Sequence, residues 1–85
     1  MAKGNFDYNY PKVIDFLKNN GYEYHEFNDG QHLKIFGDAC LIDLWPSRMK
    51  YHIIQTEGVD PNDYLSMNIY FSKKQLKKLL QTGSL

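Results

Sequence analysis

The run from Ala39 to Trp45 constrains the fold more than any other part of the sequence, because it is almost continuously apolar. An apolar run of this length is typical of a central strand that is buried on both faces. Pro46 and Ser47 end the run, since proline cannot donate a hydrogen bond to a sheet ladder. Neighbouring strands and covering helices must therefore come from the rest of the chain.

The segment before this run carries a helical pattern. Pro11 suits the first turn of a helix, where its missing N–H costs nothing. An apolar stripe at helical spacing follows, made of Val13, Ile14, Phe16 and Leu17. Gly21, after Asn20, is expected as a left-handed cap. We predict a helix over Pro11–Asn20, preceded by a polar N-terminal arm over residues 1–9.

The end of the chain predicts a second helix. Ser72 with Gln75 fits the capping box, in which two side chains satisfy the first helical turn. Gly83 is expected to stop this helix. Its buried stripe would consist of Leu76, Leu79 and Leu80.

Tyr22 to Phe27 is rich in aromatic residues and alternates, which predicts a strand. Asn28-Asp29-Gly30 predicts a turn. A loop of these three residues pairs Phe27 with Gln31 and Glu26 with His32. This register defines the faces of the hairpin, because a one-residue slip would exchange them. It places His25, Phe27, Leu33 and Ile35 on one face, and Glu26, His32, Lys34 and Phe36 on the other.

Two more strands complete the expected sheet. Tyr51–Gln55 is predicted as a strand and Gly58–Asp63 as a loop. Tyr64–Phe71 alternates, with Leu65, Met67, Ile69 and Phe71 inward. The expected fold class is α+β, an antiparallel sheet of four to five strands in the order α-β-β-β-β-β-α. Both helices on one face of the sheet would bury every stripe at once.

A chain of 85 residues is expected to form a single domain over 1–85. Cys40 is its one cysteine, so no internal disulfide can form, which indicates a reducing compartment. No apolar run approaches the roughly 18 residues that a membrane span needs. The N-terminus also lacks an apolar signal region. We expect a cytoplasmic protein without membrane contact.

Neither a metal nor a cofactor is expected. The candidate ligands do not fall at a metal-ligand spacing, and they are His25, His32, His52 and Cys40. The glycines are scattered at turns rather than gathered in a phosphate loop. Cys40 lies in the most apolar stretch, where a thiol is usually inert. His32 could act as an acid or base on a phosphodiester, and the alternative is an ordinary surface histidine.

The most distinctive segment runs from Asp43 to Tyr51. Asp43 interrupts a buried strand, and because an unpaired buried charge is costly, we expect Arg48 or Lys50 to pair with it. Trp45 and Tyr51 would flank the turn. Such a group could grip a nucleic-acid strand or a protein partner. The alternative is a Trp-Pro turn locked by one ion pair.

The second helix adds four lysines on the side opposite its leucines: Lys73, Lys74, Lys77 and Lys78. No acid follows Tyr64, so this side could contact phosphates and bind with strong salt dependence. The alternative is a solvated helix face. Exposed aromatic residues could equally build a homodimer interface.

A resemblance to small phage-encoded proteins rests on the run from His32-Leu33-Lys34-Ile35 to Ile42-Asp43-Leu44-Trp45-Pro46-Ser47, followed by Lys50-Tyr51. These mostly uncharacterised proteins share an Asp-hydrophobic-Trp-Pro-Ser or -Thr turn followed by Lys and an aromatic residue. The match covers about a quarter of the chain. Met49 stands where many of them have Gly. The resemblance implies an origin in a mobile genetic element.

A second resemblance is to HicA-type toxins, which are small RNA-cleaving domains with a double-stranded-RNA-binding-like fold. Helix Pro11–Asn20 followed by Gly30-Gln31-His32 is similar to their helix–strand–strand order and Gly-x-His motif. This resemblance implies that His32 is catalytic. The sequence departs from the family at Gln31, in the missing Pro-x-His segment and in an extra strand. The likeness is at the level of fold, which does not transfer function.

Three functions follow from these patterns. The first is a phage-encoded accessory protein that binds a host protein or complex, such as defence or nucleic-acid-processing machinery. The second is an RNA- or DNA-binding domain that uses Trp45, Arg48, Lys50 and the helix lysines. The third is a HicA-like ribonuclease that uses His32.

Overall fold

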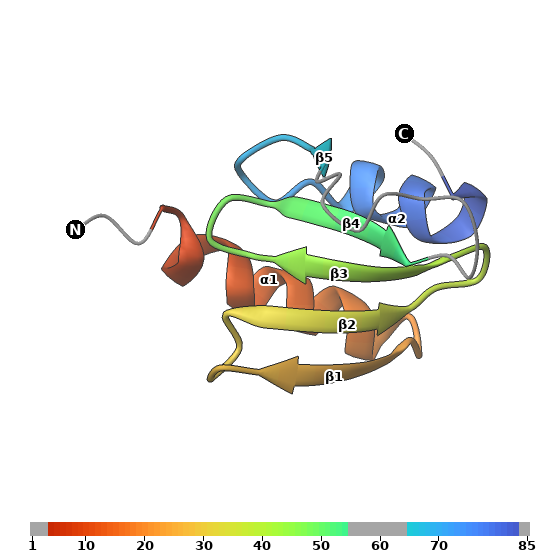
Figure 1. The fold of residues 1–85 in the computed structure, drawn as a ribbon, viewed down its shortest axis with the longest axis horizontal. Coiled ribbons are helices and arrows are strands. Elements are labelled where there is room, and N and C mark those ends of the chain that lie inside the picture. The colour runs from red at the N-terminus through yellow and green to blue at the C-terminus, as the bar shows by residue number, and fades with distance from the viewer. Residues whose placement is uncertain (1–3, 55–64, 84–85) are drawn as a thin grey trace.

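The computed structural model describes residues 4–54 and 65–83, in which two helices flank one five-stranded antiparallel sheet (Figure 1). The strands lie in chain order, so each pairs with the next. The elements are α1 (Phe6–Asn19), β1 (Glu23–Phe27), β2 (His32–Phe36), β3 (Leu41–Trp45), β4 (Lys50–Ile54), β5 (Leu65–Ser66) and α2 (Lys73–Thr82). The predicted α+β class and element order are confirmed.

Both helices pack against the same face of the sheet, as the sequence predicted. In Figure 1, α1 lies behind β2 and β3. The apolar stripes of the helices meet alternate residues of the strands in one core. The buried core residues are Val13, Ile14, Phe16, Leu17, Leu33, Ile35, Ile42, Leu44, Met49, Tyr51, Met67, Leu76, Leu79 and Leu80.

Strand β3 is buried on one face only, which corrects the prediction of a strand covered on both sides. Ile42 and Leu44 are fully buried. The residues that alternate with them, Leu41, Asp43 and Trp45, are partly exposed. The reason is that both helices lie on one side of the sheet, so no described helix covers the other.

The β1–β2 hairpin has a different register from the predicted one. Phe27 pairs with His32, so the loop covers residues 28–31. Asn28 and Asp29 take φ values of 54° and 56°, and the N–H of Gly30 donates to the carbonyl of Phe27. This is the turn geometry that matches strand twist in hairpins. Gly30 extends the loop with φ 88°.

This register moves each β1 residue to the opposite face from the one predicted relative to β2. Tyr24, Glu26, Leu33 and Ile35 share the helix side, and His25, Phe27, His32, Lys34 and Phe36 share the other. Glu26 is accommodated on the helix side because the hydroxyl of Tyr10 donates a hydrogen bond to its carboxylate. The ring of Tyr10 also occupies the space where a Cβ on residue 30 would lie. A helix residue therefore helps to fix the hairpin register.

Helix α1 begins at Phe6 rather than Pro11, so the described part of the predicted arm is mostly helical. Its early turns are held by Asn9, which is fully buried. The Nδ2 of Asn9 donates to the carbonyls of Pro46 (2.7 Å) and Ile69 (2.8 Å). Its Oδ1 accepts from the N–H of Phe71 (2.6 Å). These tertiary hydrogen bonds stabilise helical turns before Pro11, so the proline lies inside the helix rather than in its first turn.

The predicted strand Tyr64–Phe71 is reduced to β5 among the described residues. Met67 is buried as predicted, but Leu65 and Ile69 are 48% and 54% exposed. The strand ends because side chains bond the backbone groups that would continue it. Asn68 Oδ1 accepts from the N–H of Tyr70, and Asn9 bonds the carbonyl of Ile69 and the N–H of Phe71. Gln55, Tyr64 and the predicted loop over 58–63 lie outside the described residues.

Helix α2 confirms the predicted second helix and its caps. The hydroxyl of Ser72 accepts from the N–H of Gln75 at 3.3 Å, and Gly83 ends the helix with φ 84°. The side chain of Gln75 accepts from the N–H of Asn68, so only half of the expected capping box forms. Within the ranges 4–54 and 65–83, no helix has the length and apolar character needed to cross a membrane.

We expect Asn9→Ala to destabilise the protein strongly. The change would leave the buried carbonyl of Pro46 and the part-buried N–H of Phe71 without the Asn9 side chain as partner, and a buried group without a partner costs about 1–3 kcal/mol. The free energy of unfolding in urea should fall by about 2–4 kcal/mol. Asn19→Ala, at an exposed position of the same helix, is the matched control. Equal stability of the two variants would contradict the anchoring role of Asn9.

The Tyr10–Glu26 contact predicts a loss of stability at high pH. The hydrogen bond from Tyr10, its burial and the charge of Glu26 raise the pKa of Tyr10 from 10.0 to about 12. The folded state therefore holds this proton more tightly, so the stabilisation is complete below pH 10 and lost as pH rises toward 12. Urea denaturation over this range should show a smaller fall for Tyr10→Phe than for wild type. An equal fall in the free energy of unfolding for the two proteins would show that the Tyr10 proton does not contribute to stability.

Candidate binding face of the sheet

The face of the sheet opposite the helices, the open face, presents three rows of side chains across β1 to β4. Strand pairing aligns the members of each row. The first row contains Phe27, His32, Trp45 and Lys50, the middle row His25, Lys34, Asp43 and His52, and the last row Glu23, Phe36, Leu41 and Ile54. The first row is therefore mainly aromatic, the middle row is entirely ionisable, and the last row is mainly apolar.

The first row forms a ladder of stacked rings. The ring centroids of His32 and Trp45 are 4.6 Å apart with planes 6° from parallel, and those of Phe27 and His32 are 5.2 Å apart. Two rings lying flat beside each other on a sheet could not come so close, so the rings of His32 and Trp45 overlap face to face. One face of each ring is therefore covered by the other ring, and the row forms a ridge of packed side chains.

Asp43 lies between two histidines in the middle row. Its Oδ1 is 2.7 Å from Nε2 of His32, and its Oδ2 is 3.9 Å from Nδ1 of His52. The expectation that Asp43 needs a partner is confirmed, but the partner is not Arg48 or Lys50. The reason is the register, which places His52 directly opposite Asp43. Lys50 instead pairs with Trp45.

The charges on the open face are balanced. Lys34 and Lys50 are matched in number by Glu23 and Asp43. All three histidines of the chain lie on this face. His25 is 3.3 Å from the Glu23 carboxylate, and its ring contacts that of Phe36. The face is therefore close to neutral, with an imidazole in or beside each aromatic contact.

The structure separates the binding residues that the sequence grouped. Asp43, Trp45 and Lys50 lie on the open face, and Arg48 is exposed in the β3–β4 turn beside it. Tyr51 does not flank this turn at the surface. It is buried in the core, and burial raises the pKa of its hydroxyl.

The four lysines of α2 are exposed, but their helix packs against the opposite face of the sheet. They form a surface separate from Trp45. Phe27 and Phe36 are open-face rings that the sequence analysis did not include among the binding residues, and His52 is a neighbour of Asp43 that it did not identify. A correct hairpin register would have found Phe27, since it places that ring beside His32.

Cys40 and the histidines do not assemble a metal centre in the part of the chain that the structure describes, where no cluster of three His, Cys, Asp or Glu residues is placed to hold an ion. The Cys40 thiol donates to the carbonyl of Leu79 at 3.4 Å, and burial raises its pKa. Such a thiol is a poor nucleophile.

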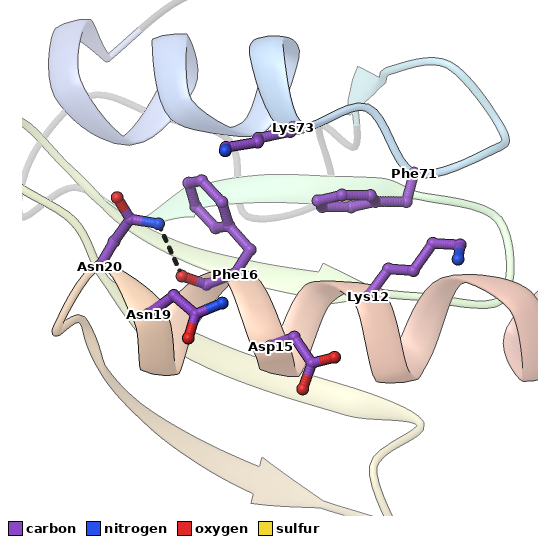
Figure 2. Close-up of a pocket in the computed structure, with 7 residues that line it drawn as sticks. All are labelled: Lys12, Asp15, Phe16, Asn19, Asn20, Phe71 and Lys73. Atoms are coloured by element: carbon purple, nitrogen blue, oxygen red, sulfur yellow. Dashed lines mark hydrogen bonds between the residues drawn. The ribbon is translucent and has the colours of Figure 1, made fainter.

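A hollow between α1 and α2 lies on the helix side of the molecule (Figure 2). Its volume is about 240 Å³, and Phe16 and Phe71 line it with ring centroids 6.2 Å apart. Lys12 and Lys73 line it from the two helices. Of the predicted binding residues only Lys73 takes part, so this hollow is secondary to the open face.

No family model, curated protein or solved structure matches the chain. The functional argument is therefore built on the geometry of the open face.

The His32–Trp45 stack predicts that the emission of the indole depends on the imidazole beside it. Trp45 is the one tryptophan of the chain, and its ring centroid lies 4.6 Å from that of His32. His32→Gln removes the stacked ring, so the tryptophan emission spectrum at fixed pH should change. His25→Gln alters another histidine of the open face and should leave the spectrum as in wild type. Identical spectra for His32→Gln and wild type would contradict the stack.

Proposed function

We propose that this protein is a binding module whose open face docks another protein. The observation that carries the proposal is the one-sided packing of the helices, which leaves Phe27 and Phe36 45% and 37% exposed. Trp45 is partly exposed between them and the β3–β4 turn. Aromatic residues presented on a firm scaffold are enriched in protein interfaces.

Charge and ring orientation favour a protein partner over a nucleic acid for this face. Nucleic-acid affinity comes largely from cations that neutralise phosphates, whereas the lysines of the open face are offset by Glu23 and Asp43. Base stacking needs ring faces, and one face of Trp45 is already stacked against His32. A partner with apolar side chains and both signs of charge fits these properties.

The resemblance of the Asp43–Tyr51 segment to small phage-encoded proteins extends the proposal. The protein would then be a phage accessory protein that acts in the host cytoplasm, and its partner would be a host protein or complex. Machinery for defence or nucleic-acid processing is the proposed class of target.

The proposal predicts that removing two rings from the open face abolishes capture of a partner. Immobilised wild-type protein and the double variant Phe27→Ser/Phe36→Ser would be exposed to bacterial lysate, and bound proteins would be quantified by mass spectrometry. At least one protein should be retained by wild type and lost from the double variant. Leu65→Ser, which alters a comparably exposed apolar side chain outside the open face, should retain it.

Urea denaturation of each variant separates loss of binding from loss of folding. A capture profile that does not distinguish the folded double variant from wild type would overturn the proposal. A partner lost only in Leu65→Ser would move the interface to β5.

RNA or DNA binding is the second candidate function, and the lysines of α2 favour it. Lys74 and Lys78 line a shallow hollow beside Asn68 and Ser72. The His32–Asp43 pair would also let His32 exchange a proton with a phosphodiester, the chemistry expected of a HicA-like ribonuclease.

A further inference from the structure

A cleft at the β3–β4 turn brings two cations together without an acid. It has a volume of about 260 Å³ and lies where the residues before α1 meet the turn and β5. Its lining includes Asn5, Ser47, Arg48, Lys50, Ser66 and Ile69. No carboxylate lines it in the described chain, and neither cation belongs to an ion pair formed among residues 4–54 and 65–83.

The turn that carries these cations is held from several directions. Met49 takes φ 51° and is fully buried, so it anchors the turn between the exposed Arg48 and Lys50. The N–H of Asn5 donates to the carbonyl of Ser47 at 2.6 Å. Gly4, with φ 62°, lies so close to this carbonyl that a Cβ would overlap it. The β3–β4 turn is therefore already ordered without a ligand, so binding would not cost the conformational entropy of ordering it.

We propose that this cleft binds a phosphate group. The planar guanidinium of Arg48 can donate two parallel hydrogen bonds to phosphate oxygens, and Lys50 adds a mobile positive charge. Ser47 and Ser66 line the same cleft, and their side chains can donate further hydrogen bonds. The cleft is larger than one phosphate, so the ligand has room for an attached group.

The cleft adjoins the open face through Lys50, which pairs with Trp45. A planar group attached to the phosphate would therefore lie near Trp45. This points to a nucleotide phosphate, either free or within a strand. The inference does not depend on the protein-binding role of the open face, because it is built on the turn.

The test is a titration of the full-length ¹⁵N-labelled protein with inorganic phosphate at constant ionic strength, followed by amide chemical shifts. Saturable shifts are expected at Ser47, Arg48 and Ser66. Arg48→Gln/Lys50→Gln should weaken binding by about tenfold or more, the loss of one to two charge-assisted hydrogen bonds. Lys12→Gln/Lys18→Gln removes the same charge from exposed positions of α1 and should leave the affinity unchanged.

Shifts that do not saturate, or that are as large with acetate, would overturn the phosphate site. An equal effect of the two double variants would also overturn it, since the response would then report net charge alone. Adenosine monophosphate and a short single-stranded oligonucleotide form the second arm. Tighter, salt-sensitive binding of the oligonucleotide identifies a strand as the source of the phosphate, and comparable binding of the monophosphate identifies a free nucleotide.

Discussion

The buried amide of Asn9 joins parts of the chain that are far apart in sequence. One side chain bonds to Pro46 in the β3–β4 turn, and to Ile69 and Phe71 before α2. The start of α1, the shape of the cleft and the approach to α2 all follow from these bonds. Asn5 adds a second link to the same turn through the carbonyl of Ser47. The end of the sheet that carries Trp45 and Lys50 is therefore positioned by the first helix.

Sequence patterns predicted the parts of the fold that short-range forces determine. The stripe of α1, the caps of α2 and the antiparallel order all arise from residues a few positions apart. The beginning of α1 and the short β5 could not be predicted in this way. They depend on hydrogen bonds between Asn9 and residues 60 and 62 positions away. The hairpin register likewise depends on Tyr10, a helix residue that contacts Glu26 and Gly30.

The candidate site was predictable at its centre and unpredictable at its edges. Asp43 interrupts an apolar run, so the sequence indicates that it needs a partner. The identity of its partners requires the pairing of β3 with both neighbouring strands, which brings His32 of β2 and His52 of β4 to its carboxylate. The sequence analysis did not recognise Phe27 and Phe36 as parts of one surface. The hairpin pairing brings them to the same face, and the packing of both helices on the other side leaves that face exposed. Arg48 and Lys50 share a cleft only because Met49 is buried between them.

The chain-order sheet has a consequence for how the molecule assembles. Every strand pairs with its neighbour in sequence, so the sheet needs little loop-closure entropy to form. Low contact order of this kind favours rapid folding. The bonds from Asn9 to Ile69 and Phe71 are different, because they require the two ends of the chain to meet. We expect the hairpins to form first and these bonds to complete the native state, so the cleft takes shape at the last step of folding.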